Sequence, residues 1–477
     1  MDERLIRYFN IMSQIINKIL CGSDITYREI NEVLSDSMCK YSVNFIKNFA
    51  DVKLEGGLQK GQLFLPSLNS DFFDKVNSIM EMNDSIYYAL LLYYMDRWIY
   101  SCYESSKNFE DDIECCEALN DNVAETGIIV LPKVRCKWEK GKRGNSWEQT
   151  MYYFYFIDCS KLNGMRLKNY IVDSNVIFEL NQESLKIAIS PLTREKMVDF
   201  SIPYTRNNER TGASQNLFRV EKILDENEME KLIFRNIVEA GKNGANILVF
   251  PEMLGTERIL TDILYQLKKR DVCVPPLVVF PSIWKKSENN CDNTNRSCLI
   301  YDGDEILFEQ YKRCCFKYSK GNIDVYEDIS QEEKYNEVHM LHIDNIGRIC
   351  IIICYDYLDS QNRAIIMENL FPTLVCSPSF STGSYDFNIL SEKYFDNSCN
   401  WVWCNTCSAI NETDNKMNFE IIGVITTLSK CNDQISLNSF KKIFEGASKC
   451  DKKDCFECLF YADIPLFDYR QRKEQEI

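Results

Sequence analysis

The feature that most constrains the fold of this chain is a regular alternation of apolar runs and helix-like segments, which starts near residue 184. The apolar runs are rich in Ile, Leu and Val and stop at Pro or polar residues, as buried strands do. The segment 226–244 between two of them repeats apolar residues every three or four positions and ends at glycines, which predicts a helix. The runs that predict strands are SLKIAISPL (184–192), NILVFPEML (246–254), PPLVVFPSIW (275–284), TLVCSPSF (373–380) and WVWCNTC (401–407).

Two hairpins are inserted into this alternation, and a polar stretch at 207–216 follows the first strand. The hairpin RSCLIYDGDEILFEQYK (296–312) has Asp-Gly at its turn, a strong local signal. The second, EVHMLHIDNIGRICIIICYD (337–356), has its predicted turn at Asn345–Gly347. Hairpins among alternating strands and helices imply a layered α/β domain with mixed sheets.

The N-terminal part has a different pattern. Apolar residues recur at spacings of three and four in 5–20 and again in 71–103, which predicts helices. Between 127 and 180, β-branched and aromatic runs separated by charged loops predict some strands. We therefore predict two domains, a mainly helical one at 1–180 and an α/β domain at 181–477.

Composition excludes several classes of function. The net charge of −16 argues against a nucleic-acid-binding surface, which needs clustered Lys and Arg. Asp96 and Arg97 interrupt the most apolar segment (85–103), so it predicts a buried helix and no membrane span. The chain opens with acidic residues and shows no secretory signal. With 22 cysteines, two adjacent pairs among them, a reducing cytoplasmic location is the expectation.

One of these cysteines, Cys354, ends the apolar run of the second hairpin. A buried thiol in such a run is ordinarily a core residue, and a cysteine nucleophile needs a base. The chain has two histidines, His339 and His342, both in one predicted strand before Cys354 and pointing to opposite faces. A papain-like pair with a histidine far downstream is thereby excluded, and a carboxylate is the most plausible base.

Suitable partners for the thiol follow two other strands. Glu252 comes after NILVF and Lys312 after EILFEQY, and Cys354 stands at the end of ICIII. Residues just beyond the carboxyl ends of strands line the active crevice of α/β sheets. The sequence thus predicts that a carboxylate, an ammonium and a thiol meet in one crevice.

This order of residues, with its flanks, resembles the nitrilase (carbon–nitrogen hydrolase) superfamily over about 184–470. The segments that carry the resemblance are GANILVFPE, YDGDEILFEQYK, GRICIIICYD, LVCSPS, DNSCNWVWCN with Asp396, Asn397 and Asn405, and CLFYADIPLFDYRQR. The resemblance implies an α-β-β-α sandwich with mixed sheets. It also implies a homodimer or higher assembly, and a chemistry that needs no cofactor or metal.

The family's roles can be placed on these positions. Cys354 would attack an amide or nitrile carbon and form a thioester, Glu252 would act as general base, and Lys312 would stabilise the oxyanion. Glu327 is the candidate for the second glutamate that many members use to orient the lysine and the substrate. The resemblance assigns the oxyanion and substrate pocket to the backbone N–H of Tyr355 and to Asp356 and Ser379. The ammonium is expected to lower the thiol pKa while the glutamate receives its proton.

Some alternatives stay open at this level. Lys317 or Lys320 replaces Lys312 if the register differs. Cys431, Cys450, Cys455 and Cys458 could close a zinc site, although the spacing is irregular and no metal site is predicted. The function predicted is a cysteine-dependent hydrolase of a non-peptide C–N bond, of amidase type, on a small-molecule amide or nitrile. The alternative is an inactive or regulated nitrilase-like binding module, with 1–180 recognising a protein partner.

Overall fold

The computed structural model describes most of the chain and forms two compact units. The first unit comprises residues 1–135, 140–164 and 170–172, and the second comprises 136–139, 165–169 and 173–477. The residues described are 3–22, 70–105, 114–115, 126–134, 136–138, 147, 151, 154–172, 177, 182–193, 196–207, 214–269, 272–287, 292–394, 398–409, 421–430, 437–445 and 458–466.

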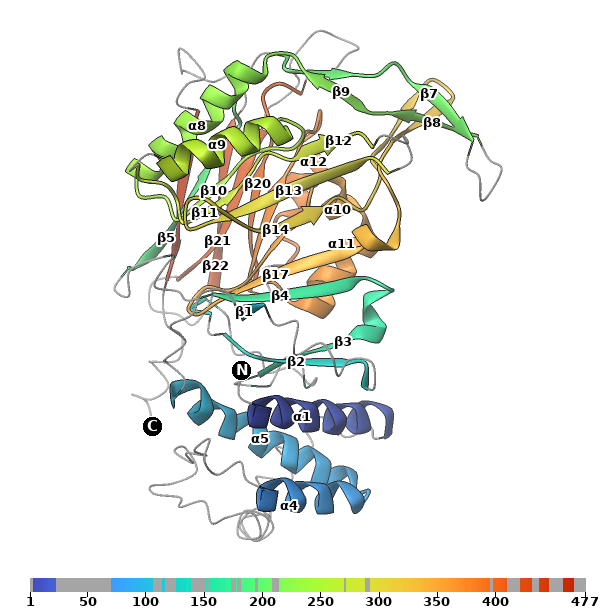
Figure 1. The fold of residues 1–477 in the computed structure, drawn as a ribbon, viewed down its shortest axis with the longest axis vertical. Helices are drawn as coiled ribbons and strands as arrows, with labels where there is room; N and C mark the ends of the chain where they lie inside the picture. Colours follow the sequence, from blue (N-terminus) through green and yellow to red (C-terminus); the bar gives the residue numbers. More distant parts are fainter. Residues whose placement is uncertain are drawn as a thin grey trace. The chain divides into compact units, whose positions relative to one another are not determined.

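The first unit contains helices and short strands (Figure 1). The segment with the interrupted apolar run is helix α5, whose residues Tyr88–Leu92 are buried. Asp96 in this helix is buried too, and its carboxylate accepts a hydrogen bond from the Phe154 N–H at 3.2 Å. No helix in the described part of the chain is long and apolar enough to cross a membrane. The elements are α1 (Glu3–Gly22), α4 (Ser70–Glu81), α5 (Ser85–Ser105), β1 (Glu114–Cys115), β2 (Ile128–Pro132), β3 (Phe154–Asp158) and η3 (Cys159–Leu162).

Two mixed sheets form the centre of the second unit. The first sheet has the order β12-β13-β11-β10-β5-β23, with β14 paired to β13. Strands β5, β10 and β11 are parallel to one another, and β13, β14 and β23 run antiparallel to their neighbours. Its strands are β5 (Ser184–Ile189), β10 (Ile247–Val249), β11 (Leu277–Val279), β12 (Ile283–Lys285), β13 (Thr294–Tyr301), β14 (Glu305–Tyr311) and β23 (Phe460–Pro465).

The second sheet contains the hairpin that leads to Cys354. Strand β17 lies between β4 (Arg166–Val172) and β18. From β17 the order is β17-β18-β19-β20-β21-β22, with an antiparallel hairpin first, then the parallel strands β18, β19 and β20, and a second hairpin at the end. Strand β10 of the first sheet packs against β19 and β20 of this one. The strands are β17 (Glu337–Ile343), β18 (Gly347–Ile351), β19 (Leu374–Pro378), β20 (Asn400–Cys404), β21 (Ile421–Lys430) and β22 (Leu437–Glu445).

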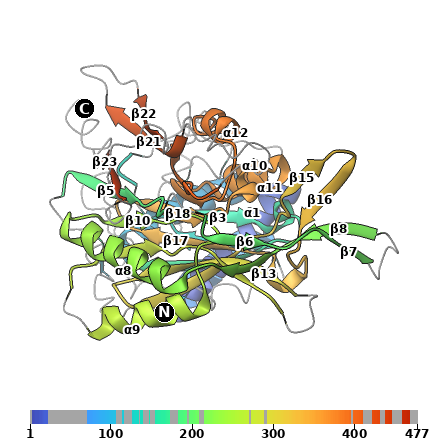
Figure 2. The same cartoon turned by 90° about the horizontal axis from the view of Figure 1, so that it is seen from above.

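Helices cover the outer faces of this pair of sheets (Figure 2). The apolar sides of α8 (Glu226–Lys242) and α9 (Glu257–Lys269) share one core with β10 and β11. On the other side, rings from α10 (Tyr355–Leu358) and α12 (Tyr385–Leu390) stack on Trp401 of β20. Next to α10 lie α11 (Ser360–Ile365) and the π-helical turn η6 (Ile366–Leu370). The predicted α/β class with mixed sheets is confirmed.

Both predicted hairpin turns are present. Asp302 and Gly303 have φ of 47° and 93°, both positive, in the three-residue loop between the paired residues Tyr301 and Glu305. Asn345 and Gly347 also have positive φ, and a Cβ on Gly347 would lie 2.5 Å from Thr373 Oγ1. The strand predicted at 401–407 is shorter than expected, because β20 ends at Cys404 and Cys407 lies in the turn after it.

The sequence pattern missed a third, smaller sheet. Its order is β15-β16-β8-β7, and β8 runs parallel to β16 with Phe218 opposite Glu327. The polar stretch predicted at 207–216 thus overlaps two of its strands. The remaining strands of this region are β6 (Val198–Phe200) and β9 (Val220–Ile223), and the sheet consists of β7 (Tyr204–Asn207), β8 (Ser214–Phe218), β15 (Lys317–Lys320) and β16 (Ile323–Glu327).

Candidate active site

Cys354 lies in a strained turn between β18 and α10. The two hydrogen bonds Ile352 N–H to Cys376 O and Cys354 N–H to Pro378 O continue the β18–β19 ladder past the end of the strand. Cys354 then turns with φ 45° and ψ −108°, a conformation that costs energy for a residue with a side chain. Its neighbour Tyr355 begins α10, and the first N–H of a helix has no acceptor within the helix. The N–H of Tyr355, the residue after Cys354, therefore has no acceptor within α10.

Glu252 is held just as firmly after β10. It is completely buried, and the next residue, Met253, has φ 65° with its N–H donated to Ser282 Oγ at 2.8 Å. The Glu252 N–H donates to Ser379 O at 3.2 Å, and its Oε2 accepts from the Phe380 N–H at 3.0 Å. The carboxylate is thereby connected to the loop that follows β19 in the facing sheet.

Lys312 follows β14 directly and joins two carboxylates. Its Nζ lies 2.7 Å from Glu252 Oε1 and 2.5 Å from Glu327 Oε2, and all three side chains are essentially inaccessible to solvent. Burial lowers the pKa of Lys312, but the charges of the two glutamates outweigh it and hold the pKa well above its usual range. The lysine is therefore an ammonium in the folded protein. Burial, together with the Glu252 charge, raises the pKa of Glu327 despite the opposing effect of Lys312.

Asn295 is a fourth member of this cluster and was not predicted. Its Nδ2 donates to Glu252 Oε1 at 2.8 Å and to Glu327 Oε1 at 3.2 Å, so one amide holds both carboxylates. The backbone oxygen of Asn295 accepts from the Lys312 N–H at 2.7 Å. The sequence could have indicated this contact, because a hairpin with its turn at Asp302–Gly303 places residue 295 of one strand near residue 312 of the other.

The Cys354 thiol contacts this cluster. Burial raises its pKa well above the ordinary value of 9.0, and the charge of Glu252 and a hydrogen bond to its carboxylate raise it further, whereas Lys312 and the Phe380 N–H lower it. Lys312 does lower the thiol pKa, as expected. Burial and Glu252 raise it by more, so the net shift of the pKa is upward. Burial is the largest effect, so the resting nucleophile is a protonated thiol under the influence of the Glu252 carboxylate.

The pocket residues expected from the resemblance lie in different surroundings. The buried carboxylate of Asp356 accepts from the backbone N–H of Arg313 and of Cys314, at 3.1 and 2.7 Å from Oδ1. Asp356 thus fixes the segment after Lys312 and is a positioning residue for the ammonium. Ser379 supplies its backbone oxygen to Glu252, and its buried Oγ has no hydrogen-bond partner among the described residues.

The remaining candidates lie elsewhere or outside the described residues. Lys317 pairs with Asp324 on β15 and β16 with an exposed side chain, so Lys312 is the lysine that meets Glu252. Both histidines lie on β17, and burial lowers the pKa of each to about 3. His339 stacks on Phe308, and His342 forms a hydrogen bond with Asn169. Asn405 binds the backbone of Ser381 through both amide atoms. Asp396, Asn397, Cys431, Cys450 and Cys455 lie outside the described residues, and no metal-binding cluster occurs among those described.

Comparison with known proteins gave matches to solved structures alone. No family profile and no curated protein matches the sequence. An amidase from Nesterenkonia sp. matches with 13% identity, 62% of this chain and 97% of that one covered, and a TM-score of 0.38. Nit3 of Saccharomyces cerevisiae, a member of branch 10 of the nitrilase superfamily, matches with 13% identity, coverages of 63% and 96%, and a TM-score of 0.38. The C. elegans NitFhit protein matches with 14% identity, coverages of 60% and 61%, and a TM-score of 0.34. At such TM-scores these matches carry no inference about the chemistry of this chain, which rests on its own side chains.

Proposed function

We propose that this chain is a cysteine-dependent carbon–nitrogen hydrolase of amidase type and a member of the nitrilase superfamily. The observation that carries the proposal is the buried Lys312 ammonium, held 2.7 and 2.5 Å from two carboxylates, of which one, Glu252, also raises the pKa of the Cys354 thiol. Strongly perturbed, mutually contacting groups of this kind are characteristic of catalytic sites. A nucleophile, a base and a cation beside them are the three parts that acyl transfer requires.

The first half of the reaction uses the thiol as it rests. Cys354 Sγ attacks the amide carbon while its proton passes to Glu252, so no free thiolate has to form in the buried site. The tetrahedral oxyanion receives hydrogen bonds from the Lys312 ammonium and the Tyr355 N–H. Glu252 then returns the proton to the departing nitrogen, the C–N bond breaks, and an acyl thioester of Cys354 remains.

The second half repeats these roles with water. Glu252 takes a proton from a water molecule as its oxygen attacks the thioester carbon, and the same two donors hold the oxyanion. The C–S bond breaks, the proton returns to the sulfur, and a carboxylic acid leaves. Glu327 keeps Lys312 charged and aimed while Glu252 holds the proton, because a nearby carboxylate favours the charged form of an amine.

A neutral electrophilic amide, chloroacetamide, tests the proposal. We expect one adduct per chain on Cys354, located by peptide mass spectrometry, and slower labelling in Glu252→Gln. Glu332→Gln removes an exposed carboxylate on the surface of the same unit, so it serves as the matched control and should label like the unaltered chain. Ammonia release from a panel of primary amides then measures turnover.

The same experiment separates an enzyme from an inactive binding module. Labelling spread over exposed cysteines, with no ammonia released from any amide, contradicts the hydrolase. Assembly into a homodimer or larger oligomer, and a protein partner for residues 1–180, remain predictions with their own tests by light scattering and by pull-down.

A further inference from the structure

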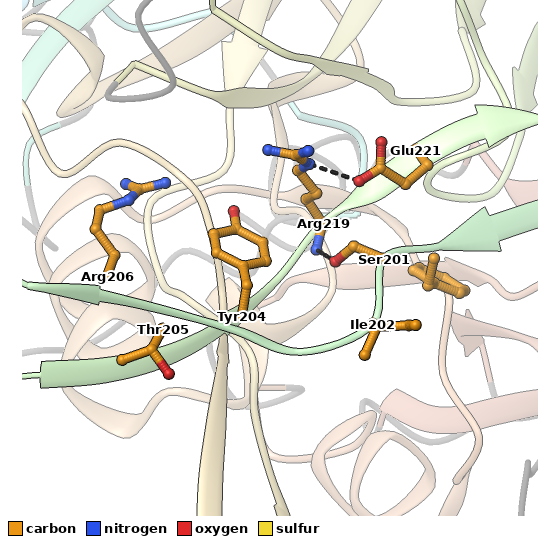
Figure 3. A pocket seen from close by; sticks show the side chains of 8 residues that line it. Ser201, Ile202, Tyr204, Thr205, Arg206, Arg219 and Glu221 are labelled. Atoms are coloured by element: carbon orange, nitrogen blue, oxygen red, sulfur yellow. Dashed lines mark hydrogen bonds and ion pairs between the residues drawn. The ribbon is translucent and has the colours of Figure 1, made fainter.

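The strands before α8 enclose an open hollow of about 560 Å³ (Figure 3). Its volume is within the range of small-molecule sites. In Figure 3 the side chains of Arg206, Tyr204 and Arg219 lie next to one another along the hairpin. The lining residues are Phe200, Ser201, Ile202, Tyr204, Thr205, Arg206, Arg219 and Glu221.

One connection to the catalytic cluster runs through aromatic rings. Phe200, which lines the hollow, packs edge-on against Phe380 with ring centroids 5.5 Å apart. The N–H of Phe380 is the group that donates to Glu252 Oε2 at 3.0 Å. Phe380 therefore contacts both Phe200, which lines the hollow, and Glu252, the proposed base.

A second connection reaches the other glutamate. Tyr204 Oη and the Arg206 guanidinium both bind Asp328 Oδ2, and Asp328 follows Glu327 directly in the chain. The Asp328 carboxylate is buried and also accepts from Asn293 Nδ2 at 2.8 Å. Tyr204 and Arg206 are thus fixed to the residue that follows Glu327 in the chain.

The hollow combines fixed guanidiniums with apolar surface. Arg206 and Arg219 line it, and each has one carboxylate partner, Asp328 for Arg206 and Glu221 for Arg219. Arg219 is held by Glu221 at 2.8 Å and by the face of the Tyr204 ring at 5.1 Å. One terminal nitrogen of Arg206 donates a hydrogen bond to Asp328, and 32% of the Arg206 side chain is exposed. Ile202 presents 88% of its surface beside them.

We propose that this hollow is a subsite for the distal end of the substrate, and that the end it takes is an anion, a carboxylate or a phosphate-like group. Guanidiniums held in place by other contacts bind such planar or tetrahedral oxyanions through paired N–H groups. Phe200 and Ile202 fit an apolar spacer between that anion and the scissile C–N bond. The proposal deepens the proposed function and rests on it for the identity of the reacting bond.

The test compares amides that differ only at the distal end. The probes are ω-carboxy and ω-phosphono primary amides of increasing chain length, each with an uncharged alkyl amide of equal length. We expect the ratio of kcat/KM for the anionic over the neutral amide to fall about 10- to 100-fold in Arg206→Gln and Arg219→Gln, the effect of one charged hydrogen-bonding partner. Arg206→Lys, which keeps the charge beside Asp328 but lacks the paired N–H groups of a guanidinium, should retain only part of the ratio. Arg258→Gln, on the exposed face of α9, is the matched control and should not change it.

Binding without turnover separates this inference from the hydrolase proposal. Calorimetric titration of Cys354→Ala with the same ω-carboxy amide should give a Kd that rises about 10-fold or more when Arg206→Gln is added. If neutral and anionic amides are hydrolysed equally, or if both arginine variants slow them equally, the subsite is refuted while the hydrolase stands. If no amide is hydrolysed but the arginine-dependent binding persists, the hydrolase fails and the anion site stands. Whichever of the two anions binds more tightly identifies the distal group.

Discussion

Replacing Lys312 by Met probes the buried cluster directly, because Met has a similar stem and no charge. In the folded protein the ammonium separates Glu252 from Glu327, which lie 2.7 and 2.5 Å from Nζ. Their nearest oxygens are then no more than about 5 Å apart. At an effective dielectric constant near 20, two unit negative charges at that distance repel by about 3 kcal/mol. Breaking a buried pair commonly costs about 3–5 kcal/mol, which agrees in size.

The cost depends on pH, and its sign follows from the carboxylates. Without the ammonium one carboxyl binds a proton to escape the repulsion, so its folded pKa lies above its unfolded one. The folded state then binds more protons than the unfolded state, and stability falls as pH rises through this range. We expect Lys312→Met to lose about 3 kcal/mol of unfolding free energy at pH 8 and to recover much of it near pH 5.

Urea denaturation at the two pH values measures this, with Lys312→Met/Glu327→Gln as the matched variant. The second change removes one of the two repelling charges, so it should restore most of the stability at pH 8 while activity stays lost by 100-fold or more for want of the oxyanion donor. A loss that is equal at pH 5 and pH 8, or that the second change fails to relieve, refutes the charge argument. It would mean that Lys312 contributes through packing alone.

Three further outcomes follow from the same contacts. The rate at which iodoacetamide alkylates Cys354, measured by mass spectrometry, should rise with pH without reaching a plateau below pH 9, because burial holds the thiol pKa well above 9.0. A plateau near pH 7 would instead indicate a stable thiolate. Asn295→Leu removes the donor shared by the two glutamates and should lower kcat about 10- to 100-fold. Chloroacetamide labelling of Cys354 and a kcat equal to those of the unaltered chain would contradict this role. Asp356→Asn disturbs the backbone N–H groups after Lys312 and should lower kcat about 10-fold with little change in KM, which steady-state kinetics would reveal.

The parts of the site that local pattern encodes could be predicted. Apolar runs that stop at polar residues placed Glu252, Lys312 and Cys354 at strand ends, and the Asp-Gly turn set the hairpin that ends at Lys312. The sheet with β8 and β16 could not be predicted, because it pairs Asn216 with Val325 in two short strands far apart in the sequence, and β8 (SQNLF) has no alternating apolar pattern. The thiol pKa also depends on burial by residues from several strands, which no short stretch of sequence reveals.

Several costly features of this fold occur at the same strand ends. Cys354 and Met253 have φ of 45° and 65°, Lys312 is a fully buried charge, and Ser379 Oγ is a buried hydroxyl without a partner among the described residues. Packing alone would favour an ordinary turn at the two strained residues and alanine in place of Ser379, and a buried charge such as Lys312 is tolerated only because Glu252 and Glu327 pair with it. Such departures from local consistency are expected at functional sites. A module used for binding through residues 1–180 would need none of them, so their concentration around one thiol favours the hydrolase over the binding module.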